Sequence, residues 1–566
     1  MRSKLTIKQW LVCIALACAA ASVSAQEPRG PRFRADDPVP ADDDRAVDAS
    51  AARRDALGGY ADFVLNTFTT TGDRRPLPAV NVNSLGEVPD SSWFTNRIGS
   101  GSLSLEDIVR GPDRASGLNV KRWVIVQGKE TGAQAGFRAV DADDPDGPMY
   151  QIEFDPAGNP EMATGAEIIG TAVYHALGYN VVEVYLIDLD LAALTISPTA
   201  TIEVAGRTRR FTRQDLEQVL KRAARKADGR YRASAGRFAE GAYKGPFRYY
   251  GTRPDDPNDV YAHEHRRELR GNRVFTAWLN HDDSRAINTL DMLVGAEGRR
   301  YIKHYMFDFG SILGSGTSGD DLPWAGHEYV VEGRPALMTF ASLGLWRRPF
   351  MRVKAPADLP AAGSFTADKF DPASWRANYP NAAFENMQPE DAFWAARLVA
   401  AFTPEAIGRI VDKARFTDPR VIDYVTGTLV RRRERILQTW LAALNPVVQP
   451  AIAERAMLRF TNAAVDAGLT DPADGYELSW FRFDNATGMR RYVGPAQRVT
   501  TPGAAIPMDK LAGTEYVGVD IRTLHEDEPR WRRPVRIYLR ATNNEWRIVG
   551  IDRRAPDGPA LLATAE

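Results

Sequence analysis

The sequence predicts an α+β protein in which a strand-rich segment precedes a helical one and a mainly β module ends the chain. Three short apolar runs between residues 123 and 154 are separated by glycine-containing turns, which is typical of antiparallel strands. From about residue 160 to residue 445, apolar side chains recur at helical spacing behind capping residues. Beyond residue 450 they alternate again, which indicates half-buried strands.

Composition and charge limit the classes of protein to consider. The 566 residues contain 72 Lys and Arg against 73 Asp and Glu, and 44% are hydrophobic. This is the composition of a globular protein, and it excludes collagen, a coiled coil and wholesale disorder. At about 150 residues a domain, the length predicts roughly three to four units. A formal net charge of −1 lacks the positive field of nucleic-acid-binding proteins, so we expect no nucleic-acid partner.

The first 25 residues have the pattern of a secretory signal peptide. Basic residues precede an apolar run, and small residues before Gln26 form a cleavage site. The run is shorter than the roughly 20 apolar residues of a transmembrane helix, and no later stretch reaches that length. We therefore expect a periplasmic or secreted protein without a transmembrane segment. Lipid anchoring at Cys18 is the less favoured alternative, and removal of Cys13 and Cys18 leaves no cysteine for a disulfide.

Residues 26–55 are predicted to form a flexible acidic and proline-rich tether. They contain many Arg, Asp, Pro and Ala residues and few large apolar side chains. Such a segment buries too little apolar surface to fold by itself. Its acidic runs at residues 36–37 and 42–44 are expected to be solvated rather than to hold a cation.

Residues 56–190 are predicted to be rich in strands. The expected strands have apolar residues bounded by turn residues, and they lie at residues 123–126, 136–140, 149–154 and 181–189. One helix is expected at residues 160–177, where apolar side chains recur at helical spacing and Gly178 marks the C-terminal end.

Residues 191–450 are predicted to be mainly helical. Thr212 and Asp215 have the spacing of a capping box at the start of a basic helix, and residues 230–250 are expected to be extended or looped. Further helices are expected at residues 264–280, from Thr403 onward, and at residues 418–444.

Residues 451–566 are predicted to form a mainly β module of unknown role. A helical stretch is expected to reach about Ala467 before the strands begin. The expected strands alternate apolar and polar residues and lie at residues 476–481, 516–519, 535–540 and 546–549. Asn543 and Asn544 are placed in a turn before the last strand.

Two acidic motifs carry the clearest chemical signal. Asp283 lies five residues before Asn288, and an Asp-Phe-Gly sequence begins at Asp308 after two apolar runs. Phosphoryl transfer requires a carboxylate that orients and deprotonates the acceptor hydroxyl, and oxygen ligands that hold Mg²⁺ beside phosphate. The pattern indicates Asp283 as the catalytic base and Asn288 and Asp308 as metal ligands. Taken alone, each motif has an alternative explanation. The first could cap the end of a helix, and the second could be the end of a strand followed by a turn.

With these motifs, residues 120–445 resemble the protein-kinase-like superfamily, in particular its atypical branch of HipA-type toxin kinases, spore-coat kinases and secretory-pathway kinases. Residues 281–283 with Asn288 resemble the catalytic loop of that family. Residues 308–310 resemble its metal-binding motif. The N-terminal tether and the C-terminal module are not explained by the resemblance.

The resemblance implies a two-lobed kinase-like fold with ATP and Mg²⁺ as cofactors. Residues 56–190 would be the small β-rich, N-lobe-like region with its single helix, and residues 191–450 the larger helical, C-lobe-like region. The turn at residues 128–132 is placed like the family's phosphate-covering loop, with an ordinary β-hairpin as the alternative. In the helix that follows, Glu161 and Glu167 are candidates for the acid that pairs with the nucleotide-binding lysine. Glu167 is preferred because it lies deeper in the helix, and a solvated helix face is the alternative.

The third expected strand departs from the family pattern at an important position. It has Glu153 where a lysine that grips the phosphates is expected. A carboxylate in a dry site beside ATP repels phosphate by several kcal/mol, so the lost lysine needs a replacement. Lys129 reaching in from the glycine-containing turn is one replacement, and a second cation bound by Glu153 is another. Without either, the chain is a pseudokinase.

The sequence thus predicts an exported kinase-like protein that transfers a phosphoryl group from a nucleoside triphosphate to a hydroxyl of a protein, peptide or small molecule. The alternative is a non-catalytic binding module that holds a partner in the cell envelope, since nucleotide is scarce outside the cytoplasm. Adenylyl transfer on the same scaffold is a third hypothesis, because a fold does not fix a function.

Overall fold

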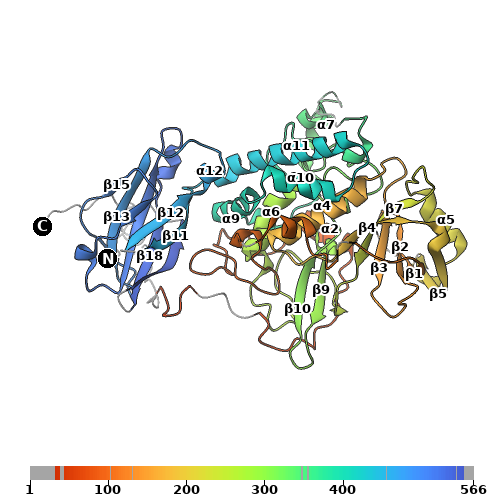
Figure 1. The fold of residues 1–566 in the computed structure, drawn as a ribbon, viewed down its shortest axis with the longest axis horizontal. Coiled ribbons are helices and arrows are strands. Elements are labelled where there is room, and N and C mark those ends of the chain that lie inside the picture. Colours follow the sequence, from red (N-terminus) through yellow and green to blue (C-terminus); the bar gives the residue numbers. More distant parts are fainter. Residues whose placement is uncertain are drawn as a thin grey trace, which may run out of the picture.

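The structure of the protein is a computed structural model. It describes residues 32–553 apart from gaps at 39–43, 102, 116, 130–131, 205, 344, 346–347, 353–355, 454–455 and 543–544. The expected signal peptide, both cysteines and the expected turn at Asn543 lie outside the described residues. Figure 1 shows three parts along the long axis, which are a sheet with its helices, a central helical region and a β module that contains the C-terminal strands.

Seven strands form the first sheet, and all neighbours are antiparallel except β1 and β5, which are parallel. In sheet order the strands are β4 (Val184–Leu189), β7 (Tyr231–Arg237), β3 (Tyr150–Phe154), β2 (Gly136–Asp141), β1 (Trp123–Gly128), β5 (Leu194–Val204) and β6 (Arg207–Arg210). The four strands predicted before residue 190 are confirmed. The sheet continues past that expected boundary because β7, distant in sequence, pairs with both β3 and β4.

The helix that begins after Thr212 covers the apolar face of this sheet. Thr212 and Asp215 form the predicted capping box at the start of α5 (Arg213–Lys221). Leu216 and Val219 on α5 belong to the same buried cluster as Phe154 on β3. The small β-rich part therefore carries α5 in addition to the single helix that was expected, because the apolar face needs a cover.

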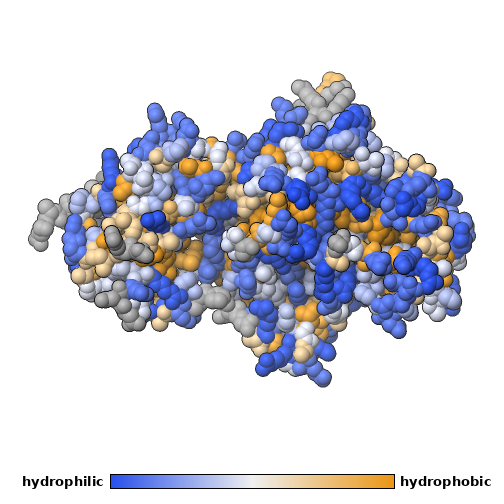
Figure 2. Space-filling model, viewed as in Figure 1, coloured by the Kyte–Doolittle hydropathy of each residue, from blue (hydrophilic) through white to orange (hydrophobic). Residues whose placement is uncertain are grey.

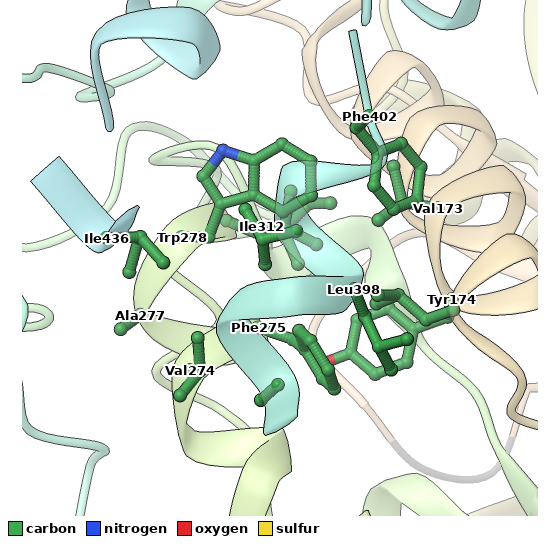
Figure 3. Close-up of a cluster of buried hydrophobic side chains, with 14 of the residues drawn as sticks. Val173, Tyr174, Val274, Phe275, Ala277, Trp278, Ile312, Leu398, Phe402 and Ile436 are labelled. Carbon is green, nitrogen blue, oxygen red and sulfur yellow. The ribbon is translucent and has the colours of Figure 1, made fainter. Parts of the chain in front are cut away.

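The central core lies between α4, α6, α9 and α11. Figure 3 shows Val173 and Tyr174 of α4 close to Phe275 and Trp278 of α6, all of them buried. At Gly271 of α6 an added Cβ would lie 2.8 Å from the Trp394 ring, so this position allows α6 and α9 to approach closely. The helices of this part are α2 (Gly59–Phe68), α3 (Leu105–Arg110), α4 (Met162–Leu177), α6 (Arg267–Leu279), α7 (Gly333–Ala341), α8 (Ala382–Glu385), α9 (Pro389–Ala400), α10 (Pro404–Lys413) and α11 (Pro419–Ile436).

The expected helices at residues 160–177, 264–280 and 418–444 are confirmed as α4, α6 and α11, the last continued by a π-helical turn at Leu437–Leu441. After α6 the chain forms a hairpin of β9 (Thr289–Val294) and β10 (Tyr301–Met306), and β8 (Ala242–Tyr243) pairs with β9. This hairpin separates the two acidic motifs in sequence.

The C-terminal module consists of two antiparallel sheets and confirms the predicted β character. Its strands are β11 (Val447–Ala453), β12 (Met457–Asn462), β13 (Gly475–Phe483), β14 (Arg490–Tyr492), β15 (Gln497–Val499), β16 (Gly503–Ala505), β17 (Tyr516–Leu524), β18 (Val535–Thr542) and β19 (Glu545–Asp552), with short helices α12 (Ala463–Asp466) and α13 (Met508–Leu511). The prediction of a helical stretch reaching Ala467 is wrong for most of its length. Residues 447–453 and 457–462 pair as β11 and β12, whose mutual hydrogen bonds override a weak local helical pattern.

The described part of residues 26–55 is held against the rest of the protein and is not a free tether. Phe33 is buried in the C-terminal module, 4.9 Å from Tyr538 between ring centroids, and Asn485 bonds both its backbone N–H and its carbonyl at 2.8 Å. Further along, Asp44 accepts hydrogen bonds from the Ser92 backbone N–H and hydroxyl. A few well-placed side chains therefore dock a segment whose overall composition is that of a linker.

Replacing Phe33 by alanine is expected to lower the stability of the C-terminal module by about 3 kcal/mol. The loss follows from removing a buried aromatic ring and leaving a cavity. Thermal unfolding measures it, with Phe68→Ala as the control because Phe68 is 64% exposed on α2. Equal transition temperatures for both variants would show that Phe33 is not docked.

Hydrophilic residues cover much of the face seen in Figure 2. Among the described residues, no helix combines the length and apolar character needed to cross a membrane.

Candidate functional site

The loop that follows α6 carries the first acidic motif. α6 ends at Leu279, and its C-cap residue Asn280 adopts a left-handed conformation with φ of 54°. The His281 backbone N–H donates to the Thr276 carbonyl at 2.8 Å. The His281 ring is buried against Phe309, with 5.8 Å between centroids. Burial lowers the pKa of His281 to about 3, so this ring is neutral and serves as a support for the loop.

Asp283 is held by three side chains. Its carboxylate forms an ion pair with Arg285, with 2.6 Å from Nε to Oδ1. Asn288 Nδ2 donates to Asp283 Oδ2 at 3.0 Å and to the Asp283 backbone carbonyl at 2.8 Å, and Asn378 Nδ2 donates to Oδ1 at 3.3 Å. These contacts fix the orientation of a carboxylate on a loop, which is what a general base requires.

The β9–β10 hairpin brings the second motif beside the first. Thr289 at the start of β9 pairs with Met306 at the end of β10, and the Phe307 backbone N–H donates to the Asn288 carbonyl at 3.3 Å. The next residue, Asp308, has a left-handed backbone with φ of 65° and begins a short 3-10 turn. Residues separated by a hairpin in sequence are therefore neighbours in space, as the spacing of the two motifs predicted.

Asp308 lies where several charged groups converge. Its pKa is raised to about 7, mainly by burial and further by the Glu153 and Asp283 carboxylates, while Lys129 and Arg285 oppose the rise. The first sheet and the loop after α6 thus face each other across Asp308. The result is a carboxylate whose charge lacks compensation, which favours uptake of a cation.

The side-chain oxygens of Asn288 and Asp308 form a ligand set that suits Mg²⁺. The amide nitrogen of Asn288 donates to Asp283, which leaves its carbonyl oxygen as a ligand beside the Asp308 carboxylate. Within the described part of the chain, no three His, Cys, Asp or Glu side chains are grouped so that they could hold a metal by themselves. Mg²⁺ is typically bound by one or two carboxylates and completed by phosphate oxygens and water, so this set suits a metal that arrives with nucleotide.

Glu167 lies on α4 against the second motif. It is buried, and its pKa is raised well above the usual value by burial and by the nearby Asp308 and Glu153 carboxylates. The backbone N–H groups of Phe309 and Gly310 bond to it. At Gly170, three residues and less than one turn further along α4, a Cβ would lie 2.4 Å from Phe309, so the missing side chain lets α4 and this turn meet. Glu167 therefore joins α4 to the metal motif.

Lys129 is paired with Glu153 and lies near Asp308. The two side chains form an ion pair, and they are 18% and 16% exposed. Lys129 Nζ also donates to the Gln134 backbone carbonyl at 3.3 Å. The lysine from the turn thus occupies the neighbourhood in which the resemblance expected a lysine from β3. Residues 130 and 131 of this turn lie outside the described residues.

A cavity of about 280 Å³ adjoins the turn between β1 and β2. Its lining combines apolar side chains with cations that could meet phosphate, namely Ile202, Phe211 and Val219 with Lys129, Lys221 and Arg222. Gln134 also lines this cavity. Its side-chain oxygen lies 3.0 Å from the place that a Cβ on Gly310 would occupy. The cavity therefore shares Lys129 and Gln134 with the surroundings of Asp308 and Gly310.

Sequence reasoning missed three groups around the loop that follows α6. Asp62 on α2 accepts hydrogen bonds from the Tyr379 hydroxyl and from the Ala286 backbone N–H within the loop. Asp321 carries a pKa raised to about 7 by burial and by the Asp283 charge. Asn378, described above, completes the set. Asp62 and Asn378 come from segments far from both motifs in sequence, Asp321 follows Asp308 by 13 residues, and none of the three has a local pattern that would have identified it.

No protein-family model matches the chain, and no curated protein matches its sequence. Among solved structures, the chain is similar to the crystal structure of a Helicobacter pylori proinflammatory kinase, CtkA, with 12% sequence identity and a TM-score of 0.28. The similarity covers 55% of this chain and 92% of that one. It is a distant likeness, and the function proposed below rests on the side chains described above.

Proposed function

We propose that this chain is a kinase-like phosphotransferase that moves a phosphoryl group from ATP or a related nucleoside triphosphate to a hydroxyl of a protein, peptide or small molecule. The observation that carries the proposal is the convergence of Asp283, Asn288 and Asp308 around one point, with Asp283 held by Arg285 and Asn288. A site without catalysis has no physical need to bring these acids together in a partly buried place.

Each residue has a separate task in this reaction. Asp283 accepts the proton of the acceptor hydroxyl as the acceptor oxygen bonds to the γ-phosphorus, and the bond from that phosphorus to the bridging oxygen breaks with ADP as the leaving group. Asn288 and Asp308 would hold Mg²⁺, which supplies charge neutralisation at the phosphates. Glu167 keeps α4 attached to the backbone at Phe309 and Gly310, so that Asp308 stays in position.

Labelled ATP tests the reaction class directly. The full chain incubated with Mg²⁺ and ATP labelled with ³²P at the γ position is expected to release labelled phosphate or to label protein. ATP labelled at the α position is expected to leave the protein unlabelled. Label from the α position alone would replace phosphoryl transfer by adenylyl transfer, and no turnover with either would contradict catalysis.

Lys129 is proposed as the phosphate-binding lysine in place of the missing one on β3. Lys129→Met is expected to weaken binding of ATP with Mg²⁺ at least about tenfold, because a charge-assisted contact to phosphate is lost. Lys129→Glu is expected to weaken it further by repulsion. The double variant Lys129→Glu with Glu153→Lys exchanges the two charges and so keeps the ion pair with its cation. We expect it to recover most of the affinity for ATP with Mg²⁺. A double variant no better than Lys129→Glu would contradict this role.

One observation favours the alternative function, a non-catalytic binding module of the cell envelope. Glu153 on β3 already neutralises Lys129, so the net charge offered to phosphate is small. This alternative predicts no Mg²⁺-dependent nucleotide binding in any variant, whereas the phosphotransferase predicts binding that depends on Lys129.

We further propose that the chain is exported to the periplasm or secreted after cleavage before Gln26. Mass spectrometry of the mature protein is expected to find Gln26 at the N-terminus. A lipidated Cys18 at the N-terminus would establish the anchored form.

A further inference from the structure

A second cavity, of about 230 Å³, lies where the first sheet meets the β9–β10 hairpin. None of the six residues Lys129, Glu153, Glu167, Asp283, Asn288 and Asp308 lines it. Its walls come from the C-terminal end of α4, from the segment after β7 and from β10, which contribute His175, Glu240 and Lys303 among others. The cavity is therefore a site separate from the one described above.

Cations outnumber acids in the lining of this cavity. The cations are Arg97, Arg114, Arg237 and Lys303, and the acids are Glu183 and Glu240, so four positive and two negative charges leave a net charge of +2. Both acids are shared between the same two arginines. Glu183 lies 3.2 Å from Arg114 and 2.6 Å from Arg237, and Glu240 lies 3.1 Å and 3.6 Å from the same pair.

The surplus charge belongs to Arg97 and Lys303. Arg97 Nη1 donates to the His175 and Tyr179 carbonyls at 2.8 and 3.0 Å, where α4 ends. Among the described residues, Lys303 forms no ion pair, and its ammonium lies 5.2 Å from the centroid of the Tyr305 ring. Burial and the positive charges of Arg97 and Arg114 lower the pKa of Lys303 against the opposing effect of Glu240, so this cation would gain from a further anion.

The lining also offers a polar atom without a partner. His175 Nδ1 is buried and has no hydrogen-bond partner in the described structure. Burial and the charge of Arg97 lower the pKa of His175 to about 3, so the ring is neutral at pH 7 and can donate one hydrogen bond without adding charge. His175 therefore adds nothing to the net charge of the lining.

We propose that this cavity binds a phosphate oxyanion, either free phosphate or the phosphoryl group of a phosphorylated side chain. The net charge of the lining matches a phosphate monoester, which carries about −1.5 to −2 at pH 7. Arginine forks and a lysine ammonium are the donors that commonly bind such groups. The proposal does not depend on phosphoryl transfer at Asp283, because it rests on a different set of residues.

Binding of inorganic phosphate to the full chain at low ionic strength tests the proposal. Isothermal titration is expected to show saturable binding of one phosphate at this cavity. Sulfate is expected to compete, and chloride at equal ionic strength is not. Absence of saturable phosphate binding, or equal competition by chloride, would overturn the proposal.

Matched variants locate the site. Lys303→Met is expected to weaken phosphate binding at least about tenfold, and Lys303→Arg to keep it, since the charge remains. Lys121→Met makes the same change of charge at an exposed residue outside the cavity and is expected to bind as the natural chain does. Loss of binding in Lys129→Met with full binding in Lys303→Met would place the phosphate at the candidate active site and overturn the proposal.

The source of the phosphoryl group is decided by comparing ligands. Tighter binding of O-phosphoserine than of inorganic phosphate would support a phosphorylated side chain as the occupant. The reverse order would support free phosphate. In both cases Lys303→Met must weaken binding of the ligand that the natural chain binds more tightly. If Lys303→Met binds both ligands as well as the natural chain does, the proposal is overturned.

Discussion

Replacing Asp283 by asparagine is expected to lower the rate of ATP turnover about 1,000-fold while ATP affinity changes little. Asparagine keeps the shape of the side chain and its place beside Arg285 and Asn288, but it cannot take the proton of the acceptor. The measurement is release of ³²P from γ-labelled ATP together with equilibrium binding of ATP in Mg²⁺. A loss in turnover without a loss in affinity assigns Asp283 to the chemical step.

Asp282 provides the matched control for this variant. It is the neighbouring residue, it is buried, and burial together with the charges of Asp321 and Asp283 raises its pKa well above the usual value. Asp282→Asn makes the same change, from carboxyl to carboxamide, at the residue next to Asp283. Its turnover is expected to stay within about tenfold of that of the natural chain. Equal losses in both variants would mean that the loop, and not the Asp283 carboxylate, sets the rate.

Replacing Asp308 by asparagine is expected to weaken Mg²⁺-dependent ATP binding about 100-fold or more and to abolish measurable turnover. The carboxylate is the charged ligand in the proposed metal set, and a neutral amide oxygen binds a hard divalent cation far more weakly. The measurement is the ATP dissociation constant across a series of Mg²⁺ concentrations. Asp320→Asn is the control, because it makes the same substitution at an exposed carboxylate outside the proposed metal set. Equal affinities in the two variants would remove Asp308 from the metal site.

The parts of the site that share a short stretch of sequence could be predicted. Asp283 and Asn288 lie on one loop, and only a two-stranded hairpin separates them from Asp308, so their spacing in sequence nearly determines their proximity. The helices α4 and α6 were equally predictable because their apolar residues recur at the helical period over several turns.

The parts that depend on distant segments could not be predicted. The ion pair of Lys129 with Glu153 depends on how the turn between β1 and β2 folds toward β3, and sequence alone left it as one of two alternatives. Asp62 contacts Ala286 in the loop that follows α6, although it lies on a helix more than 200 residues earlier in the sequence. The docking of Phe33 required knowledge of an aromatic cluster near the other end of the chain. In each case the position of the side chain depends on a tertiary contact that the local sequence does not reveal.

Thermal unfolding of the full chain with ATP tests the central claim most directly. A ligand that binds only the folded state raises the free energy of unfolding by about 2.7 kcal/mol at 100 times its dissociation constant. The account predicts a rise in the unfolding temperature that requires both ATP and Mg²⁺ and is lost when EDTA removes the metal. An unchanged unfolding temperature in millimolar ATP with Mg²⁺ or Mn²⁺ would contradict a nucleotide site built on Asn288 and Asp308.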